Sequence, residues 1–290
     1  MQIGPGSDEI VRYWVVDAFT RVPFKGNPAA VCLLPHALDD ALMQAIAAEM
    51  NLSETAFVMP VGNMPWKEAT RFSLRWFTPK VEVRLCGHAT LGTAAVLFGA
   101  VGVQVTSVTF ETLSGDLIAR RVAGGGGACE TITLDFPADT PVPCELPAGA
   151  LEALGVASAQ AAVYGTRARD LLIHLAEAQQ VRDLRPDFTA LLACEDLASY
   201  RGLMVTAAGE PPYDFVSRFF APRVGINEDP VTGSAHTLLT PYWSALLGKT
   251  EMLAYQASAR GGEIGVRLAE HGRVALTGDA VVVFKGELCV

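Results

Sequence analysis

The chain has 290 residues, of which 50% are hydrophobic and 18% are charged, and its formal net charge at pH 7 is −9. This composition is typical of a globular protein with one large domain or two domains of ordinary size, and it excludes a disordered chain. The longest basic run is Arg120-Arg121. Because nucleic acid binding requires clustered Lys and Arg, we expect no nucleic acid partner, whereas a small anionic substrate is compatible with the sequence.

The sequence carries no recognisable targeting or membrane segment. The first ten residues, MQIGPGSDEI, have neither a basic start nor an apolar core, so we expect no secretory signal. No run of 18 apolar residues occurs, so we expect neither a membrane span nor a membrane partner. The cysteines are scattered without a C-x-x-C pair, which indicates reduced thiols and a cytoplasmic location; they are residues 32, 86, 129, 144, 194 and 289.

Hydrophobic patterns predict strands and helices in both halves of the chain. Asp39 is positioned to cap a helix that ends near Asn51. The small, apolar run 89–100 predicts a helix that is buried on all sides. In the first half we expect strands at 11–19, 29–34, near 54–58, 71–77, 105–111, 116–122 and 131–136.

The second half repeats this alternation after a turn or linker at Gly124–Gly127 and a proline-rich tract, Pro137–Pro147, where the chain could cross between halves. Many short strands with few helices favour an α+β fold over a doubly wound parallel sheet. We expect helices near 148–155 and 187–194, and strands near 161–165, 170–176, 202–207, 214–220, 251–258, 263–269, 273–277 and 280–284.

The stretch Arg218–Trp243, RFFAPRVGINEDPVTGSAHTLLTPYW, contains the main candidate loop. It predicts a buried strand, an acidic turn and a helix that starts at Gly233-Ser234-Ala235. The backbone N–H groups at such a helix start can bind an anion. Pro241 predicts a kink or a shortened helix.

A similar stretch occurs earlier in the chain. Residues 75–81 match residues 218–224 at an offset of 143, and Gly87-His88-Ala89 matches Gly233-Ser234-Ala235 at an offset of 146. In this alignment Cys86 stands opposite Thr232. The repeat predicts two related halves, with chance similarity of two apolar strands as the alternative.

Several common functional motifs are absent. Gly248-Lys249-Thr250 lacks the first glycine of a P-loop, the glycine run is no dinucleotide fingerprint, and no G-x-S-x-G elbow exists. The histidines show no metal-binding spacing, so we expect no metal site.

Six residues remain as candidates for chemistry: Glu54, Cys86, His88, Asp229, Ser234 and His236. Burial of Glu54 among apolar neighbours would raise its pKa and allow one carboxyl group to take and return a proton. Each candidate has a structural alternative: Glu54 as an exposed strand-edge residue, Asp229 as a turn former, His88 as a helix-start residue and Cys86 as a buried apolar residue.

Four motifs lie in order along the chain: GNPAAV (26–31), NLSETAFV (51–58), FTPKVEVRLCGHATLG (77–92) and FAPRVGINEDPVTGSAH (220–236). Together they resemble the PhzF family of phenazine-biosynthesis-like isomerases, whose fold is shared with diaminopimelate epimerase and proline racemase. The resemblance implies an α+β fold of two domains related by a pseudo-twofold axis, each with a curved, mostly antiparallel sheet around a central helix. We expect these domains at 1–137 and 138–278, with 279–290 as a final strand that returns to the first half.

The resemblance also implies an active site between the domains, no cofactor, a homodimer and a small anionic metabolite as substrate. The catalytic residues would be Glu54 as the general acid/base, His88 and Asp229. The substrate would bind at Cys86, Gly87, Ala89, Thr232, Gly233, Ser234 and Ala235. The implied reaction is a proton shift catalysed by a single Glu.

The sequence departs from the racemase and epimerase relatives at Thr232, where those proteins need a second thiol. Isomerisation is therefore the leading hypothesis. The alternatives are an amino-acid epimerase or racemase, and a non-catalytic binding protein with the same fold.

Overall fold

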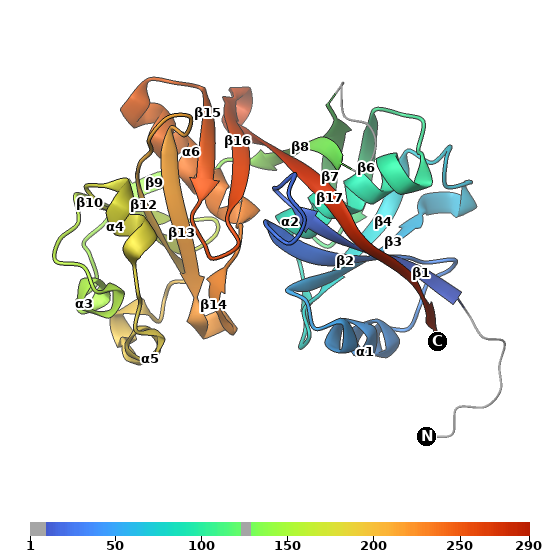
Figure 1. Ribbon diagram of the computed structural model, residues 1–290, viewed down its shortest axis with the longest axis horizontal. Coiled ribbons are helices and arrows are strands. Elements are labelled where there is room, and N and C mark those ends of the chain that lie inside the picture. Colours follow the sequence, from blue (N-terminus) through green and yellow to red (C-terminus); the bar gives the residue numbers. More distant parts are fainter. Residues whose placement is uncertain (1–9, 123–128) are drawn as a thin grey trace. The chain divides into compact units, whose positions relative to one another are not determined.

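The computed structural model describes residues 10–122 and 129–290 (Figure 1). The chain divides into two compact units. The first extends to Leu134 and also includes Asp279–Val290, and the second contains Asp135–Gly278. The glycine run Gly124–Gly127, expected to be a turn or linker, lies outside the described residues. No helix in the described part of the chain is long and apolar enough to cross a membrane.

The first unit is a strand-rich fold with two α-helices among its described residues, and its strands are mostly short. A π-helical segment, Val96–Val101, continues the second of these helices. The elements are β1 (Ile10–Ala18), β2 (Asn27–Leu33), α1 (Asp40–Met50), β3 (Glu54–Pro60), β4 (Arg71–Phe77), β5 (Glu82–Val83), α2 (Gly87–Ala95), β6 (Ser107–Thr112), β7 (Gly115–Arg121) and β8 (Cys129–Pro137).

The second unit contains more helices, most of them short. Short 3₁₀ turns occupy Glu195–Leu197, Pro222–Val224 and Glu270–Gly272. The elements are β9 (Pro141–Pro143), α3 (Ala150–Leu154), β10 (Ala161–Gly165), β11 (Asp170–His174), α4 (Ala178–Asp183), α5 (Phe188–Ala193), β12 (Gly202–Ala208), β13 (Phe215–Ala221), β14 (Ile226–Asp229), α6 (Gly233–Leu247), β15 (Glu251–Gln256), β16 (Gly262–Ala269) and β17 (Arg273–Cys289).

The strands of the two units pair in the same order and with the same directions. In the first unit, β1–β2, β3–β4 and β6–β7 are antiparallel, whereas β2–β3 and β4–β6 are parallel. In the second unit, β10–β11, β12–β13 and β15–β16 are antiparallel, whereas β11–β12 and β13–β15 are parallel. The internal repeat seen in the sequence therefore has a counterpart in the strand pairing.

The same ion pair supports the loop after the matching strand in each unit. Arg75 on β4 donates two hydrogen bonds to Glu82, at 2.7 and 2.8 Å, and Arg218 on β13 donates two to Glu228, at 2.7 and 2.9 Å. Each guanidinium also lies over an aromatic ring two residues further along its strand, at 5.1 and 5.0 Å from the ring centroid. A bidentate Arg–carboxylate pair fixes geometry as well as charge, so each loop is held in a defined path.

Helix α1 forms as the sequence predicted. The side chain of Asp39 accepts a hydrogen bond from the backbone N–H of Ala41 at 2.8 Å, and Asn51 ends the helix in the left-handed conformation at φ 48°. Met43, Ile46 and Ala47 form its buried face. The expected cap and end of this helix are confirmed.

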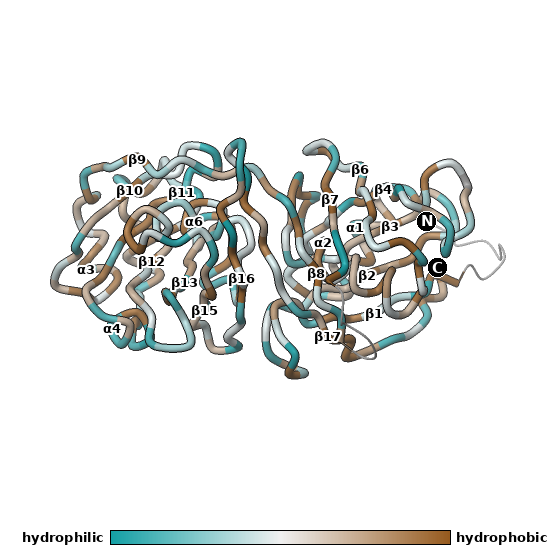
Figure 2. The backbone as a smooth tube through the Cα atoms, turned by 90° about the horizontal axis from the view of Figure 1, so that it is seen from above, coloured by the Kyte–Doolittle hydropathy of each residue, from teal (hydrophilic) through white to brown (hydrophobic). Residues whose placement is uncertain are grey.

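Helix α2 is buried along its length from His88 to Ala95, as its composition predicted. It contacts β1, β2, β3 and β7 of its own unit (Figure 1). Small residues allow close packing: a Cβ atom at Gly92 would lie 3.4 Å from Cβ of Val16. Figure 2 shows hydrophobic residues along the strands that form the interior, such as β2 in the first unit and β12 in the second. Each unit also has an apolar cluster between its strands and its outer helices, which are α1 in the first unit and α3, α4 and α5 in the second.

Helix α6 does not stop at Pro241, and the expectation of a shortened helix was wrong. The helix runs for 15 residues, from Gly233 to Leu247. A proline has no N–H, so the carbonyl four residues earlier, that of Thr237, loses its helical partner. The backbone N–H of Asp139 donates to this carbonyl at 3.0 Å. The helix tolerates Pro241 because a distant segment of the same unit supplies the missing hydrogen bond.

Two further elements differ from the sequence-based expectation. Residues 273–277 and 280–284 were expected to be separate strands, but both belong to β17. Residues 273–277 of β17 pair with β16, and residues 280–289 pair antiparallel with β1. Helix α4 was not predicted from the sequence.

Candidate functional site

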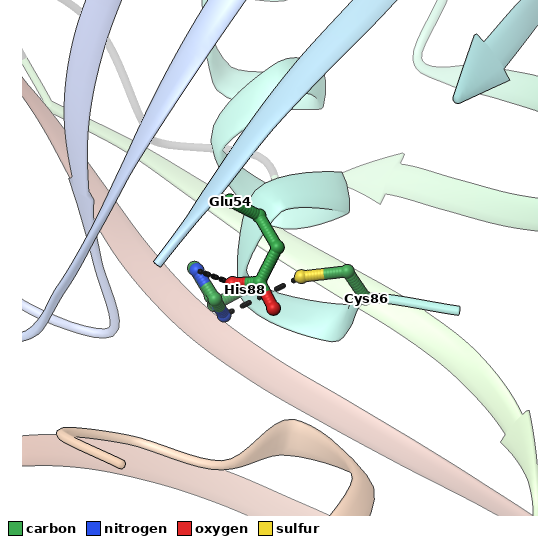
Figure 3. Close-up of side chains that lie close together, drawn as sticks. All are labelled: Glu54, Cys86 and His88. Carbon is green, nitrogen blue, oxygen red and sulfur yellow. Dashed lines mark hydrogen bonds and ion pairs between the residues drawn. The ribbon is translucent and has the colours of Figure 1, made fainter. Parts of the chain in front are cut away.

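Three side chains with reactive groups converge in the first unit: Glu54, Cys86 and His88 (Figure 3). Oε2 of Glu54 lies 3.2 Å from Nε2 of His88, and Sγ of Cys86 lies 3.5 Å from Nδ1 of the same ring. Glu54 is the first residue of β3, whereas Cys86 and His88 lie at the start of α2. The parallel pairing of β3 with β2 and the packing of α2 on both strands bring these distant parts of the sequence together.

The first residue of β2, Asn27, is a fourth member of this cluster. Gly26 has φ 62°, and a Cβ atom at this position would lie 2.1 Å from the carbonyl oxygen of Ala18, so only glycine fits. This tight approach directs the fully buried Asn27 toward the ring of His88, and Nδ2 of Asn27 lies 3.2 Å from Nδ1 of His88. In this orientation of the amide, Nδ2 can only donate, so Nδ1 accepts and a neutral ring carries its proton on Nε2. That proton faces Glu54.

Burial determines the charge of His88. Its side chain is 6% exposed, and desolvation lowers its pKa from 6.5 to about 3, against a smaller opposing effect of the Pro28 backbone. The N-terminus of α2 also disfavours a positive charge at this position. His88 is therefore neutral at physiological pH, and it serves as a hydrogen-bond donor rather than as a cation.

The carboxyl group of Glu54 is largely shielded from solvent. Its side chain is 12% exposed, and Oε2 is buried. The contact between Oε2 and Nε2 of His88 is close, but it is not aligned for a hydrogen bond. The alternative of an exposed strand-edge residue is inconsistent with this burial.

Cys86 is the residue that precedes α2, and its side chain does not cap the helix. Its backbone carbonyl accepts a hydrogen bond from Oγ1 of Thr90 at 2.5 Å. Gly87, His88 and Ala89 form the first turn, whose backbone N–H groups have no partner within the helix itself. The cluster in the first unit thus combines one carboxyl, one thiol and one neutral imidazole beside a helix start.

In the second unit, Asp229 and Thr232 are linked in one hydrogen-bond network. Oγ1 of Thr232 donates to Oδ2 of Asp229 at 2.7 Å. The buried side chain of Gln256 accepts from the backbone N–H of Thr232 at 2.8 Å and donates to the backbone carbonyl of Asp229 at 2.8 Å. Gln256 at the end of β15 therefore holds the acidic loop in place at both ends.

Ser234, in the first turn of α6, lies beside an ion pair whose carboxylate is buried. Arg201 donates to both carboxylate oxygens of Asp170, at 2.9 and 2.5 Å, and to Oγ of Ser234 at 3.1 Å. Asp170 is fully buried, and desolvation raises its pKa to about 6, although Arg201 counteracts this shift. Gly233 and Ala235 complete the first turn of the helix. His236 is fully buried behind it, with Nδ1 2.8 Å from the carbonyl oxygen of Thr232.

Of the two corresponding strands β3 and β12, only β3 in the first unit begins with a glutamate. Thr55 pairs with Phe77 in β3–β4, and Leu203 pairs with Phe220 in β12–β13, where Phe77 and Phe220 are 143 residues apart in the repeat. The position before Leu203, which corresponds to Glu54, is Gly202. A Cβ atom at Gly202 would lie 2.3 Å from the ring of Phe219. The second unit therefore has no room for an equivalent carboxyl group.

The structure places the sequence candidates in two clusters, one in each unit. Three important partners were not among the candidates: Asn27, Gln256 and Arg201. Asn27 lies within the motif GNPAAV, and this signal could have identified it. Gln256 and Arg201 act through contacts between strands that are far apart in the sequence. The only group of three metal-ligating side chains found among the described residues is Glu54, Cys86 and His88.

The sequence profile of phenazine biosynthesis-like proteins (PhzC-PhzF) matches residues 16–286. The chain belongs to this family. It is 46% identical to phenazine biosynthesis-like domain-containing protein 1 of Mus musculus, over 95% of this chain and 98% of the mouse protein. It is also 46% identical to an uncharacterized isomerase of Halalkalibacterium halodurans, over 95% of this chain and 97% of that protein. The resemblance noted from the four motifs is confirmed.

Solved structures agree with this assignment. A PhzF family protein of Enterococcus faecalis superimposes with a TM-score of 0.87 at 41% identity, and the match covers 97% of this chain and all of that one. A probable proline racemase of Agrobacterium radiobacter shares the fold alone, with a TM-score of 0.61 at 11% identity. This PhzF-family chain thus has the fold that proline racemase-like proteins share, as the sequence predicted.

Proposed function

We propose that this PhzF-family protein is a cofactor-independent isomerase in which Glu54 acts as a single general acid/base on a small metabolite that carries a carboxylate. The observation that carries the proposal is the shielded carboxyl of Glu54 beside a neutral imidazole, with a glycine at the matching position of the second unit. Relatives of similar length are named isomerases, which agrees with this reaction class.

The reaction has two proton transfers. The carboxylate of Glu54 removes a proton from an activated C–H bond of the substrate, and the electron pair of that bond enters the conjugated system of the substrate. The neutral carboxyl then returns the proton to another carbon, which leaves Glu54 ionised again. Because a single carboxyl does both steps, the proton is delivered to the face from which it was removed.

His88 and Asn27 support this reaction by holding a hydrogen-bond donor next to Glu54. The Nε2–H of neutral His88 faces Oε2 of Glu54 and can donate to a carboxylate or to a substrate oxygen. Asn27 fixes the ring through Nδ1. We assign the binding of the polar groups of the substrate to Cys86 and the first turn of α2, and to Asp229, Thr232 and the first turn of α6, as the family resemblance implies. The homodimer and the cytoplasmic location stay predictions.

The test replaces Glu54 by Gln, which keeps the shape of the side chain and removes the base. Purified wild-type protein and Glu54→Gln are incubated in deuterated water with a panel of cyclic and open-chain amino and hydroxy carboxylates. Mass spectrometry then measures product formation and deuterium uptake. We expect the variant to lose a factor of roughly 10²–10⁴ in rate, the range of general acid–base catalysis. Glu49→Gln, an exposed glutamate on α1, is the matched control and should retain the rate.

The outcome also discriminates the second candidate function, an amino-acid epimerase or racemase. The closeness of the Cys86 thiol to His88 favours this alternative, whereas Thr232 at the matching position opposes it. Exchange at an α-carbon that survives in Glu54→Gln but disappears in Cys86→Ser would identify the epimerase. A wild-type rate in Glu54→Gln on a genuine substrate would falsify the single-carboxyl proposal.

A further inference from the structure

We propose that Glu54, Cys86 and His88 also form a binding site for a zinc ion, and that zinc at this site inhibits the enzyme. No pair of potential zinc ligands in the sequence has a short metal-binding spacing. The structure instead brings together one carboxylate, one thiol and one imidazole from β3 and the start of α2 (Figure 3). These are the three side-chain types that bind zinc in proteins.

The distances between the three donor groups suit one ion. The ligand atoms of the three residues lie within 4.8 Å of one another. In a tetrahedral zinc site, with Zn–N and Zn–O distances of about 2.1 Å and Zn–S of about 2.3 Å, neighbouring ligand atoms are separated by about 3.4–3.6 Å. The contact of Oε2 of Glu54 with Nε2 of His88 is 3.2 Å, close to this separation, whereas Sγ of Cys86 lies 3.5 Å from Nδ1, the other nitrogen of the ring. Binding of one ion by all three residues therefore requires the Cys86 side chain to turn from Nδ1 toward Nε2.

A second observation comes from the orientation of His88. Its Nε2 is buried and has no aligned hydrogen-bond partner among the described residues, although it faces the carboxyl of Glu54 at 3.2 Å. An ion between Nε2 and Oε2 would bind both atoms at once. Asn27 contacts the opposite nitrogen, Nδ1, and such a contact to the far ring nitrogen is typical of histidines that bind metals.

The types of ligand atom in this cluster determine which metal ions can bind. A thiolate and an imidazole favour zinc and other borderline or soft ions, whereas magnesium and calcium require several oxygen ligands. The cluster offers one carboxylate, so hard cations would bind poorly. Three protein ligands leave a fourth position for water, as in open zinc sites. When zinc binds, the thiol of Cys86 loses its proton to the solvent and becomes a thiolate.

Binding of zinc would occupy the carboxyl group to which the proposed function assigns proton transfer. Zinc should therefore compete with the substrate, and chelation should restore activity without any change in the covalent structure. The inhibition rests on the proposed function of Glu54. Zinc binding itself does not, so the two proposals can fail separately.

The experiment measures metal binding directly, by isothermal titration calorimetry with zinc and by the thiolate charge-transfer absorbance of added cobalt(II). It uses the full chain with the exposed Cys289 replaced by Ser, since an exposed thiol would add background binding. Cys86→Ser, His88→Gln and Glu54→Gln are compared in this background. Cys32→Ser is the matched control, because Cys32 is a buried cysteine of the same unit outside the cluster.

We expect one zinc ion per chain, cobalt absorbance that requires Cys86, and at least a tenfold loss of zinc affinity in each of the three variants but not in Cys32→Ser. Circular dichroism of each variant identifies any that are unfolded, and the remaining variants decide the test. Absence of zinc binding by the parent protein at micromolar concentrations would overturn the proposal. So would equal affinity in Cys86→Ser and the parent. If zinc binds but Glu54→Gln keeps full turnover, the proposed function fails and the metal site stands.

Discussion

The fully buried His236 makes the stability of the protein depend on pH. Nδ1 of His236 contacts the carbonyl oxygen of Thr232 at 2.8 Å, so Nδ1 donates and Nε2 carries the lone pair. Nε2 is buried without a hydrogen-bond partner among the described residues, and the ring stacks on Phe215 with 6.0 Å between centroids. A proton on Nε2 would therefore be a buried, uncompensated charge, and desolvation lowers the pKa of His236 from 6.5 to about 4.

The direction of the effect follows from proton linkage. Between pH 6.5 and 4 the unfolded chain binds a proton at His236 that the folded protein does not bind, so acid favours unfolding in this range. With these two pKa values, lowering the pH from 7 to 5 removes about 2 kcal/mol from the free energy of unfolding through His236 alone. The stability is fully present above pH 6.5 and is lost as the pH falls toward 4.

The assay compares wild-type protein with His236→Gln by urea denaturation at pH 5, 6 and 7. Gln cannot titrate, so the variant should lose about 2 kcal/mol less than wild type between pH 7 and pH 5, whatever its stability at pH 7. His271→Gln is the control, because the side chain of His271 is 91% exposed. Parallel pH profiles of wild type and His236→Gln would refute the argument that His236 is neutral in the folded protein.

Two further predictions concern the network around α6. Arg201→Met leaves the carboxylate of Asp170 buried without its cation, and should lower the free energy of unfolding by about 3–5 kcal/mol. Adding Asp170→Asn to this variant should recover much of the lost stability. A double variant no more stable than Arg201→Met would contradict this prediction. Gln256→Met leaves the backbone N–H of Thr232 without its acceptor, and should destabilise the protein by about 1–3 kcal/mol in thermal or urea unfolding. An unchanged unfolding midpoint would show that Gln256 does not hold the loop.

The sequence predicted those parts of the fold that depend on local patterns. Helix α1 was identified with its cap at Asp39 and its end at Asn51, because caps and apolar faces are short-range signals. The continuation of α6 through Pro241 was missed, because the compensating N–H belongs to Asp139, about 100 residues earlier in the chain. A rule about proline in helices has no access to such a tertiary contact.

The candidate site shows the same difference between features that local sequence patterns predict and features that depend on tertiary contacts. Glu54, His88 and Asp229 were named as candidates because the family motifs contain them. Gln256 and Arg201 were not named, because only tertiary contacts bring Gln256 to the Asp229–Thr232 loop and Arg201 to Ser234. The spacing of residues in the sequence does not indicate the cluster of Glu54, Cys86 and His88, because Glu54 and Cys86 are 32 positions apart (86 minus 54). The packing of α2 on β3 brings them together.

The path of β17 has a consequence for folding during synthesis. Residues 280–289 supply a strand that pairs with β1, yet they are translated after the whole of Asp135–Gly278. The unit that begins the chain therefore leaves the ribosome with an open edge at β1, while the unit made later is complete first. We expect the nascent first unit to depend on chaperones or on delayed compaction until its last strand arrives, because an unpaired strand edge promotes aggregation.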